Sequence, residues 1–344
     1  MWWFNTSRGA EWFGIYLWIG KDYAWLMDWN VMGMCFGFAS VMWTIFLMLQ
    51  AVALKNYVEW YHLIGQMLWL LGNYWWQWGG LHDVCFPTET SVYPVHEEEA
   101  RVILAAGLVW ITIYYVILRP LRIFPKPSQI ALDDYNDSGV DPPAHLSFMF
   151  RTGRQYENIH VYMWLGKDWA WNAASPITWW ISAIPTLYIS IDFIYRSSFL
   201  RHGIINHIHF IVLFTWVTAN LIWAWGEIYM ADYDDVLPLF PPEEYIEDAW
   251  LTCRWYSLWV LMISTCILVT MYAIWIPMSA LDLVIEKDEP ITIWEAAEHA
   301  EHAHGDGHGD GHGHGGHGDG HGHGHGNHGH DKGHDSKSMS VSAH

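Results

Sequence analysis

The chain is poor in cysteine and in charged side chains. Four of its 344 residues are Cys, and none of them stands in a C-x-x-C spacing, so the sequence indicates neither a disulfide framework nor a cysteine-based zinc site. Only 15% of the residues are charged, and the formal net charge is −20. Because no basic face is available to meet phosphates, nucleic-acid binding is not expected.

The motifs of familiar soluble enzymes are also missing. The sequence has no G-x-S-x-G, no Walker loop, no G-x-G-x-x-G after a strand and no H-E-x-x-H. The N-terminus lacks a charged start followed by an apolar core and a small-residue cleavage site, so no cleavable signal peptide is expected. These absences do not favour an enzyme.

Apolar residues, in contrast, make up 52% of the chain, which contains 26 Trp. Long apolar stretches must form helices in a bilayer, because hydrocarbon cannot hydrogen-bond the backbone. We therefore expect an all-α, multi-pass integral membrane protein that contacts the lipid bilayer. Six transmembrane helices are predicted, at Trp29–Leu54, Tyr57–Leu81, Ala100–Leu118, Ile177–Tyr195, Gly203–Tyr229 and Trp250–Pro277.

One phrase occurs twice. YLWIGKDYAW begins at Tyr16 and YMWLGKDWAW begins at Tyr162, and seven of their ten positions are identical. The correspondence continues at a nearly constant offset, where a second set of rare residues recurs: His62, Trp69, Asn73, Trp76, Trp78 and Gly79 match His209, Trp216, Asn220, Trp223, Trp225 and Gly226. This periodicity indicates an internal duplication.

The duplication predicts the domain organisation. We expect a first membrane repeat at 1–123, a polar linker at 124–156, a second membrane repeat at 157–285 and a disordered His- and Gly-rich tail at 286–344. If each repeat has three membrane helices, the odd number makes the second copy enter the membrane upside down. The sequence thus predicts an inverted-topology repeat, an architecture found in many secondary transporters.

Polar residues inside the second helix of each repeat share one helical face. In the first copy these are His62, Trp69, Asn73 and Trp76, and in the second copy they are His209, Trp216, Asn220, Trp223 and Glu227. Polar groups in a bilayer face protein or water, so both stripes are expected to face inward. They either line a shared ligand site near the midplane or serve as packing contacts between helices.

The repeated W-x-G-K-D-x-A-W phrase allows two interpretations. Trp and Tyr at headgroup depth, with Lys reaching outward, would form an interfacial anchor. The conserved order between the copies instead suggests a specific contact, in which Asp22 and Asp168 pair with the adjacent Lys, cap a helix or reach into the core. Both aspartates are therefore candidate ligand-binding residues.

Histidines provide the candidate metal ligands. One His from each copy, His62 and His209, could hold haem, copper or zinc. The tail carries 14 of the 22 His, interleaved with Gly and Asp, a composition that could bind Zn, Cu or Ni. Its candidate ligands are His308, His312, His314, His321, His323 and His325.

The patterns W-x-G-K-D-x-A-W and H-x10-N-x2-W-x2-G-E, the latter formed by His209, Asn220, Trp223, Gly226 and Glu227, resemble an uncharacterised family of polytopic membrane proteins. The resemblance covers the membrane part and implies the same segmentation.

Three functions follow as expectations. The first is a transporter or channel for a cation, either a divalent metal or a small organic cation, with a midplane site between the repeats. The second is a haem- or copper-binding subunit. The third is a structural subunit that contacts neighbouring membrane proteins or a second copy of this chain.

Overall fold

A computed structural model describes residues 7–85, 93–124, 143–146, 149–150, 153–197, 199–229 and 249–280. The candidate metal ligands of the tail lie outside these residues. Both predicted membrane repeats belong to one unit of the chain, Met1–His304.

The described residues form helices and no strand. The long helices of the first half are α1 (Ser7–Leu26), α2 (Asn30–Ala53), α3 (Tyr57–Cys85) and α4 (Tyr93–Ile113), which continues as a π-helical turn at Tyr114–Leu118. A 3₁₀ turn (Ala144–Leu146) and the short α6 (Gly153–Glu157) follow. The second half contains α7 (Ile159–Asn172), α8 (Pro176–Arg196), α9 (Phe199–Tyr229) and α10 (Ala249–Ala280).

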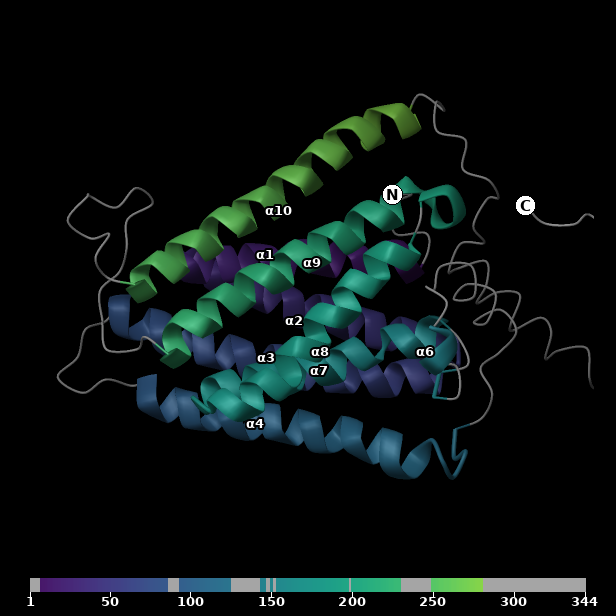
Figure 1. Ribbon diagram of the computed structural model, residues 1–344, viewed down its shortest axis with the longest axis horizontal. Coiled ribbons are helices and arrows are strands. Elements are labelled where there is room, and N and C mark those ends of the chain that lie inside the picture. Colours follow the sequence, from purple (N-terminus) through teal and green to yellow (C-terminus); the bar gives the residue numbers. More distant parts are fainter. Residues whose placement is uncertain are drawn as a thin grey trace, which may run out of the picture. The chain divides into compact units, whose positions relative to one another are not determined.

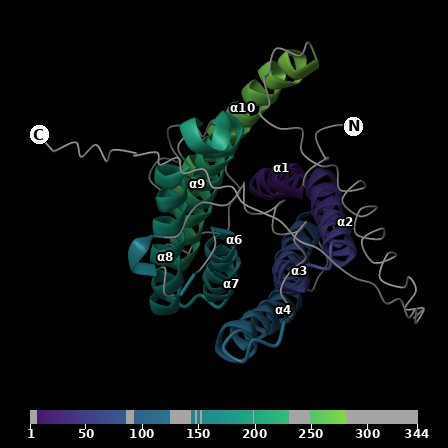
Figure 2. The same ribbon diagram turned by 90° about the vertical axis from the view of Figure 1, so that its right-hand side faces the viewer.

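The long helices pack side by side as a closed ring (Figures 1 and 2). Around the ring, α1 contacts α2, α2 contacts α3, and so on through α4, α7, α8, α9 and α10 back to α1. Across the ring, α3 also contacts α7 and α1 contacts α9. The segments with the repeated phrase, α1 and α7, therefore pack against the helices of the opposite half.

The prediction of an inverted topology is wrong. Glu11 near the start of α1 and Glu59 near the start of α3 both bind Arg154 of α6, the short helix just before α7. Trp12 of α1 stacks on His209, early in α9, with ring centroids 4.5 Å apart. The N-terminal ends of α1, α3, α7 and α9 thus lie together, and the halves run in the same direction. The physical reason is that the W-x-G-K-D segment itself forms a helix, which gives each half an even number of four.

Five helices, α2, α4, α8, α9 and α10, are long and apolar enough to cross a membrane. Outer helices expose large apolar side chains, such as Val31 (76% exposed), Val102 (65%), Ile177 (77%) and Val269 (60%). Such continuous apolar surfaces suit lipid contact. The sixth predicted span, Tyr57–Leu81, forms α3 but is not among the five. Its polar residues Glu59, Asn73 and Gln77 lower its hydropathy, and all three are buried against protein.

The glycine of the repeated phrase allows close packing of helices. A Cβ atom added at Gly20 would lie 2.8 Å from the Phe36 ring of α2, and one at Gly166 would lie 2.6 Å from Ser182 Oγ of α8. A side chain at either position would require the neighbouring Phe36 or Ser182 side chain to shift.

An arginine from each half also caps the helix that carries the phrase in the other half. Arg254 of α10 donates to the carbonyl oxygens of Trp25 and Leu26, at the end of α1, and to Asp28 Oδ1 at 3.0 Å. Arg101 of α4 donates to the carbonyl and side-chain oxygens of Asn172, at the end of α7. Cationic side chains at these C-terminal ends hydrogen-bond the free carbonyl groups and interact favourably with the helix dipole. Burial raises the pKa of Asp28, although Arg254 acts in the opposite direction.

Candidate functional site

Two lysine–aspartate pairs lie buried at the centre of the bundle. Lys21 bonds to Asp22 and Lys167 bonds to Asp168. All four residues are 3% or 4% exposed. The interpretation of the repeated phrase as an interfacial anchor is therefore wrong, and the alternative in which its aspartates reach the core is confirmed. Buried ion pairs are tolerated when further hydrogen bonds compensate for lost hydration.

Those further bonds come from the opposite half. Asp22 of α1 accepts a bond from Trp216 Nε1 at 2.8 Å and one from Asn220 Nδ2 at 3.2 Å, both on α9. The same Asn220 amide nitrogen donates to the Trp216 carbonyl, which orients the side chain. Each of these hydrogen bonds to the ionised carboxylate is charge-assisted, so the position of the carboxylate is well fixed.

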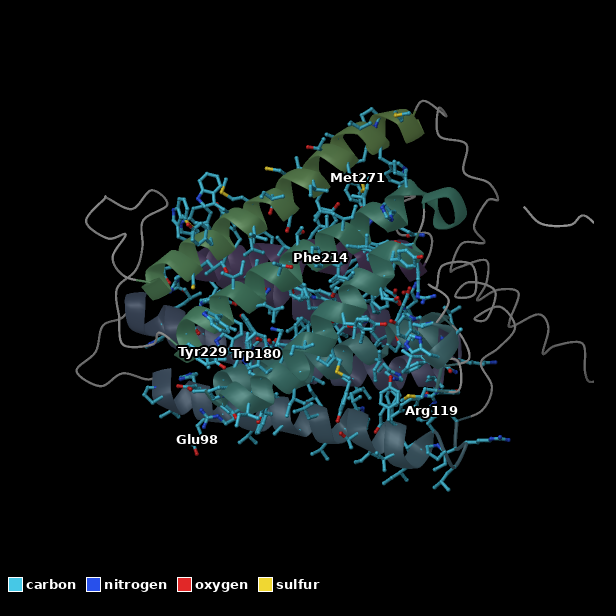
Figure 3. All side chains as sticks on the ribbon, in the orientation of Figure 1. Glu98, Arg119, Trp180, Phe214, Tyr229 and Met271 are labelled. Carbon is cyan, nitrogen blue, oxygen red and sulfur yellow. The ribbon has the colours of Figure 1, made fainter. Side chains whose placement is uncertain are left out.

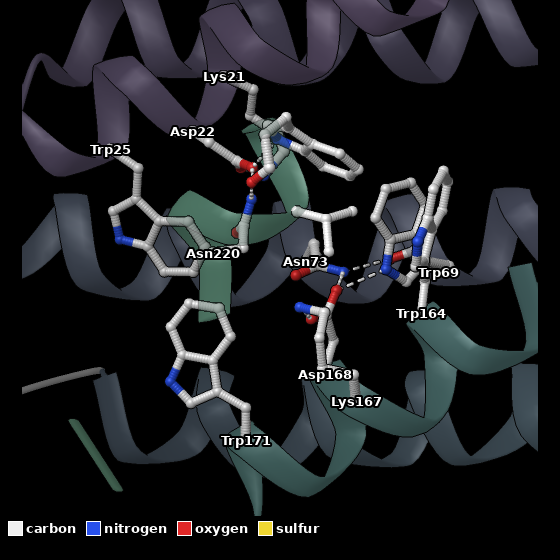
Figure 4. Close-up of a pocket in the computed structure, with 12 residues that line it drawn as sticks. Lys21, Asp22, Trp25, Trp69, Asn73, Trp164, Lys167, Asp168, Trp171 and Asn220 are labelled. Atoms are coloured by element: carbon white, nitrogen blue, oxygen red, sulfur yellow. Dashed lines mark hydrogen bonds and ion pairs between the residues drawn. The ribbon is translucent and has the colours of Figure 1, made fainter. Parts of the chain in front are cut away.

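Asp168 of α7 has the equivalent partners on α3. Trp69 Nε1 donates to its Oδ2 at 2.6 Å, and Asn73 Nδ2 donates to the same oxygen at 3.2 Å (Figure 4). The inward stripes predicted from the sequence thus contribute Trp and Asn to the two aspartates. Helical spacing within each half does not indicate that the partners are exchanged between the halves.

Eight tryptophans enclose the charged centre. A first tryptophan cluster has ring centroids 5.2 to 6.2 Å apart and consists of Trp18, Trp69, Trp164 and Trp216. A second tryptophan cluster has neighbouring centroids 5.0 to 5.3 Å apart and consists of Trp25, Trp76, Trp171 and Trp223. The two clusters border the Lys–Asp pairs, and Figure 4 shows Trp25 and Trp171 on the opposite side of the carboxylates from Trp69 and Trp164.

The lysines contact the second cluster directly. Lys21 Nζ lies 5.3 Å from the centroid of a Trp25 ring, and Lys167 Nζ lies at the same distance from Trp171. An ammonium group over an indole face gains cation–π stabilisation of about 0.5–2 kcal/mol. Each lysine is therefore held by one carboxylate and one aromatic face.

Glu227 distinguishes the two halves. Its carboxylate accepts bonds from Trp171 Nε1 at 2.8 Å and from Trp223 Nε1. The first half has Gly80 at the corresponding position. Within the part of the chain that the structure describes, the carboxylate of Glu227 contacts the second-half members of the second tryptophan cluster. Glu227 thus lies beside the predicted site but contacts its tryptophans rather than its lysines.

The centre is filled by side chains. The cavity between the Lys–Asp pairs has a volume of about 10 Å³. This volume is at the lower limit for one water molecule. The centre is therefore closed in this structure, and the ammonium group of each lysine takes the place next to the carboxylate that a free cation would need.

His62 and His209, which were expected to share a site, contact different helices. His62 contacts the Val58 carbonyl through Nδ1 and the Tyr115 hydroxyl through Nε2, at 2.8 and 3.4 Å. His209 makes the equivalent contacts with Ile205 and Tyr272, at 2.8 and 3.1 Å. Both nitrogens of each ring are thus engaged. No group of three or more metal-type side chains is found among the described residues.

Several residues of the site were not singled out by the sequence stripes. They are the lysines and the tryptophans at both ends of the phrase, for which an interfacial anchor was one of two interpretations: Trp18, Lys21, Trp25, Trp164, Lys167 and Trp171. The conserved order of the phrase, which already suggested a specific contact for Asp22 and Asp168, is the signal that also includes these residues, since an anchor requires only composition. Arg254 of α10 also lies outside the stripes, and it caps α1.

No protein-family model matches this chain, and neither does any curated protein or solved structure. The family resemblance based on the W-x-G-K-D-x-A-W phrase therefore stays a prediction.

Proposed function

We propose that the protein is a multi-pass membrane transporter or channel for a small cation, bound at Asp22 and Asp168. The observation that carries the proposal is the environment of the lysine ammonium groups. Each is a cation held between a buried carboxylate and an indole face. The same two kinds of group recognise free ammonium and organic cations.

A free cation can compete with the tethered one. The lysine stem is long and flexible, so its ammonium can leave while the backbone stays in place. Asp22 would keep the donors Trp216 and Asn220 during this exchange, because both lie on α9 and not on the lysine's own helix. Displacement of lysine by substrate is thus the simplest step that opens the closed centre.

The chemistry favours an ammonium-type cation over a divalent metal. Hard divalent cations require about six oxygen ligands. Each aspartate here is surrounded by N–H donors and tryptophan rings, which cannot ligate a metal. A monovalent cation with a diffuse charge needs only one carboxylate and the aromatic faces.

Uptake of radiolabelled methylammonium into liposomes that contain the purified full-length protein tests the proposal. We expect uptake above that of empty liposomes, reduced at least about tenfold in Asp22→Asn and Asp168→Asn, since a charged hydrogen bond contributes about 1.5–3 kcal/mol. The double variant Lys21→Met/Asp22→Asn, which leaves no buried charge unpaired at that pair, is expected to lose uptake as well. The exposed Glu98→Gln is the control and should transport normally. Wild-type uptake equal to that of empty liposomes, or unchanged uptake in both aspartate variants, would overturn the proposal.

A structural membrane subunit is the second candidate. The filled centre, with a cavity of only about 10 Å³, is the observation that favours it, because a packed polar core can specify a fold without binding anything. That function predicts loss of a larger assembly on deletion and no methylammonium uptake. A haem or copper subunit stays a prediction, which an absorption spectrum of the purified protein would test.

The parallel halves also support a proposal for the orientation in the membrane. Positive side chains gather at the end where α1, α3, α7 and α9 begin, namely Lys55, Arg119, Arg122, Arg154 and Arg196. Arg101 and Arg254 lie at the opposite end. Figure 3 labels Arg119 and Glu98 at opposite ends of α4. By the positive-inside rule, we propose that the arginine-rich end faces the cytoplasm.

Single cysteines in a cysteine-free background test this orientation. We expect a membrane-impermeant maleimide to label Glu98→Cys on intact cells, and to label Arg122→Cys only after the membrane is opened. Both positions are exposed, so accessibility within the protein does not limit the reaction. The reverse pattern would show that the arginine-rich end faces outward.

A further inference from the structure

Glu227 lies near the end of α9, on the side of the molecule opposite the arginine-rich end. Figure 3 labels Tyr229, two residues further along α9, on the same side as Glu98 and away from Arg119. Glu227 is only partly buried, so a small ion from solution can approach it. The central Lys–Asp pairs, in contrast, are closed off by side chains.

The carboxylate of Glu227 is held by neutral donors. Trp171 Nε1 donates to Oε2 at 2.8 Å, and Trp223 Nε1 donates to Oε1. Within the described part of the chain, no basic side chain forms an ion pair with this carboxylate. An ionised carboxylate has about four acceptor positions, so roughly two of them stay open for a further donor.

Two charged side chains from other helices act on Glu227, namely Arg254 of α10 and Glu97 of α4. Both are engaged elsewhere. Arg254 binds Asp28 and the end of α1, and Glu97 binds Arg101 at 3.1 Å. Neither supplies a direct counter-ion to Glu227. A carboxylate near the end of a membrane helix is costly without a cationic partner, and such residues commonly mark ion pathways.

The two indoles that hold this carboxylate also lead to the two lysines of the central site. Trp171 carries the ammonium group of Lys167 over its ring, at 5.3 Å from the centroid. Trp223 packs against Trp25, with ring centroids 5.1 Å apart, and Trp25 carries the ammonium group of Lys21. One or two indoles thus separate the carboxylate from each lysine.

The first half indicates that the packing of these rings does not depend on a glutamate at this position. It has Gly80 there, and its rings Trp25 and Trp76 have centroids 5.3 Å apart. The centroids of Trp171 and Trp223 are 5.0 Å apart. Binding of a ligand therefore accounts for the carboxylate better than support of the tryptophan cluster does.

We propose that Glu227, held by Trp171 and Trp223, is an outer binding site for a monovalent cation of the ammonium type. A single carboxylate with open acceptor positions suits a cation that donates N–H hydrogen bonds, whereas a divalent metal requires about six oxygen ligands. The role of this site as the entry to Asp22 and Asp168 rests on the proposed function, whereas cation binding at Glu227 does not.

Saturation-transfer NMR of the purified full-length protein in detergent, with methylammonium as the probe, tests the proposal. We expect magnetisation transfer from aromatic protons of the protein to the methyl group of the probe. The apparent affinity should be at least about tenfold weaker in Glu227→Gln, because a charged hydrogen bond is lost. The exposed Glu98→Gln, at the same end of the molecule, is the matched control and should bind as the wild type does.

Two further variants keep the result interpretable. Glu227→Gly reproduces the residue that the first half has at this position, and we expect it to fold and to lose binding as Glu227→Gln does. Lys21→Met/Asp22→Asn changes the central site and should keep the signal. A wild type without magnetisation transfer would rule out the outer site. A signal that is unchanged in both Glu227 variants and lost in Lys21→Met/Asp22→Asn would do the same, because it would place the binding at the centre.

The NMR measurement does not involve transport, so its failure leaves the liposome experiment to decide the proposed function. Conversely, a signal that depends on Glu227, together with absent methylammonium uptake, would keep the outer cation site and remove only its role as an entry.

Discussion

Replacement of Lys21 by Met is expected to lower the free energy of unfolding by about 3–5 kcal/mol, the cost of breaking a buried ion pair from one side. The reason is that Asp22, at 4% exposure, would keep its neutral donors Trp216 and Asn220 but would lose the cation that balances it. The measurement is thermal or denaturant unfolding of the detergent-purified protein at neutral pH.

Two matched variants separate this cause from simple loss of packing. Lys21→Met/Asp22→Asn removes both charges, and we expect it to recover most of the lost stability, because an uncharged pair leaves nothing uncompensated. Lys55→Met removes an exposed lysine and should change the unfolding free energy by less than about 0.5 kcal/mol. Equal stability of Lys21→Met and Lys55→Met would contradict a buried pair at this position.

The apolar segments could be predicted from the sequence, because hydrocarbon leaves few options for the backbone. The expected span Trp29–Leu54 corresponds closely to α2, Asn30–Ala53. The inward direction of Asn73 and Asn220 was likewise readable from helical spacing, since polar groups avoid lipid.

The parallel arrangement of the halves could not be predicted, because it depends on α1 and α7, which are not apolar enough to be recognised as membrane helices. α1 carries Lys21 and Asp22 in its last two turns, and these charges reduce its hydropathy. When only the apolar helices are counted, each half has three, and this odd number predicts that the second half is inverted relative to the first. The charges are tolerated because the surrounding tryptophans and asparagines, not lipid, contact them.

The partners of each charge could not be predicted either. Asp22 is bound by Trp216, a residue 194 positions away, and local spacing carries no information about such a contact. The cluster around Arg154 was hidden for a similar reason. A Pro-rich, charged stretch is typical of a surface linker, yet the end of that stretch contributes the arginine that joins α1 to α3.

Removal of this arginine gives the second large expected effect. Arg154→Met would remove the guanidinium that Glu11, Glu59 and Glu157 share, and we expect the free energy of unfolding to fall by about 3–5 kcal/mol at neutral pH. The loss should become smaller as the pH falls. Without the arginine, the folded state favours protonated carboxyl groups more strongly than the unfolded chain does, so it binds more protons at intermediate pH. Stability then rises as the pH is lowered.

Unfolding curves at several pH values, compared between Arg154→Met and the exposed control Arg122→Met, test this sign. The control should follow the wild type at every pH, because Arg122 lies at the surface. Arg154→Lys should be intermediate, since a single ammonium group restores the charge but cannot bind several carboxylates in the forked geometry of a guanidinium. A deficit in Arg154→Met that stays constant or grows on acidification would mean that lost packing, rather than repulsion among the three glutamates, causes the instability.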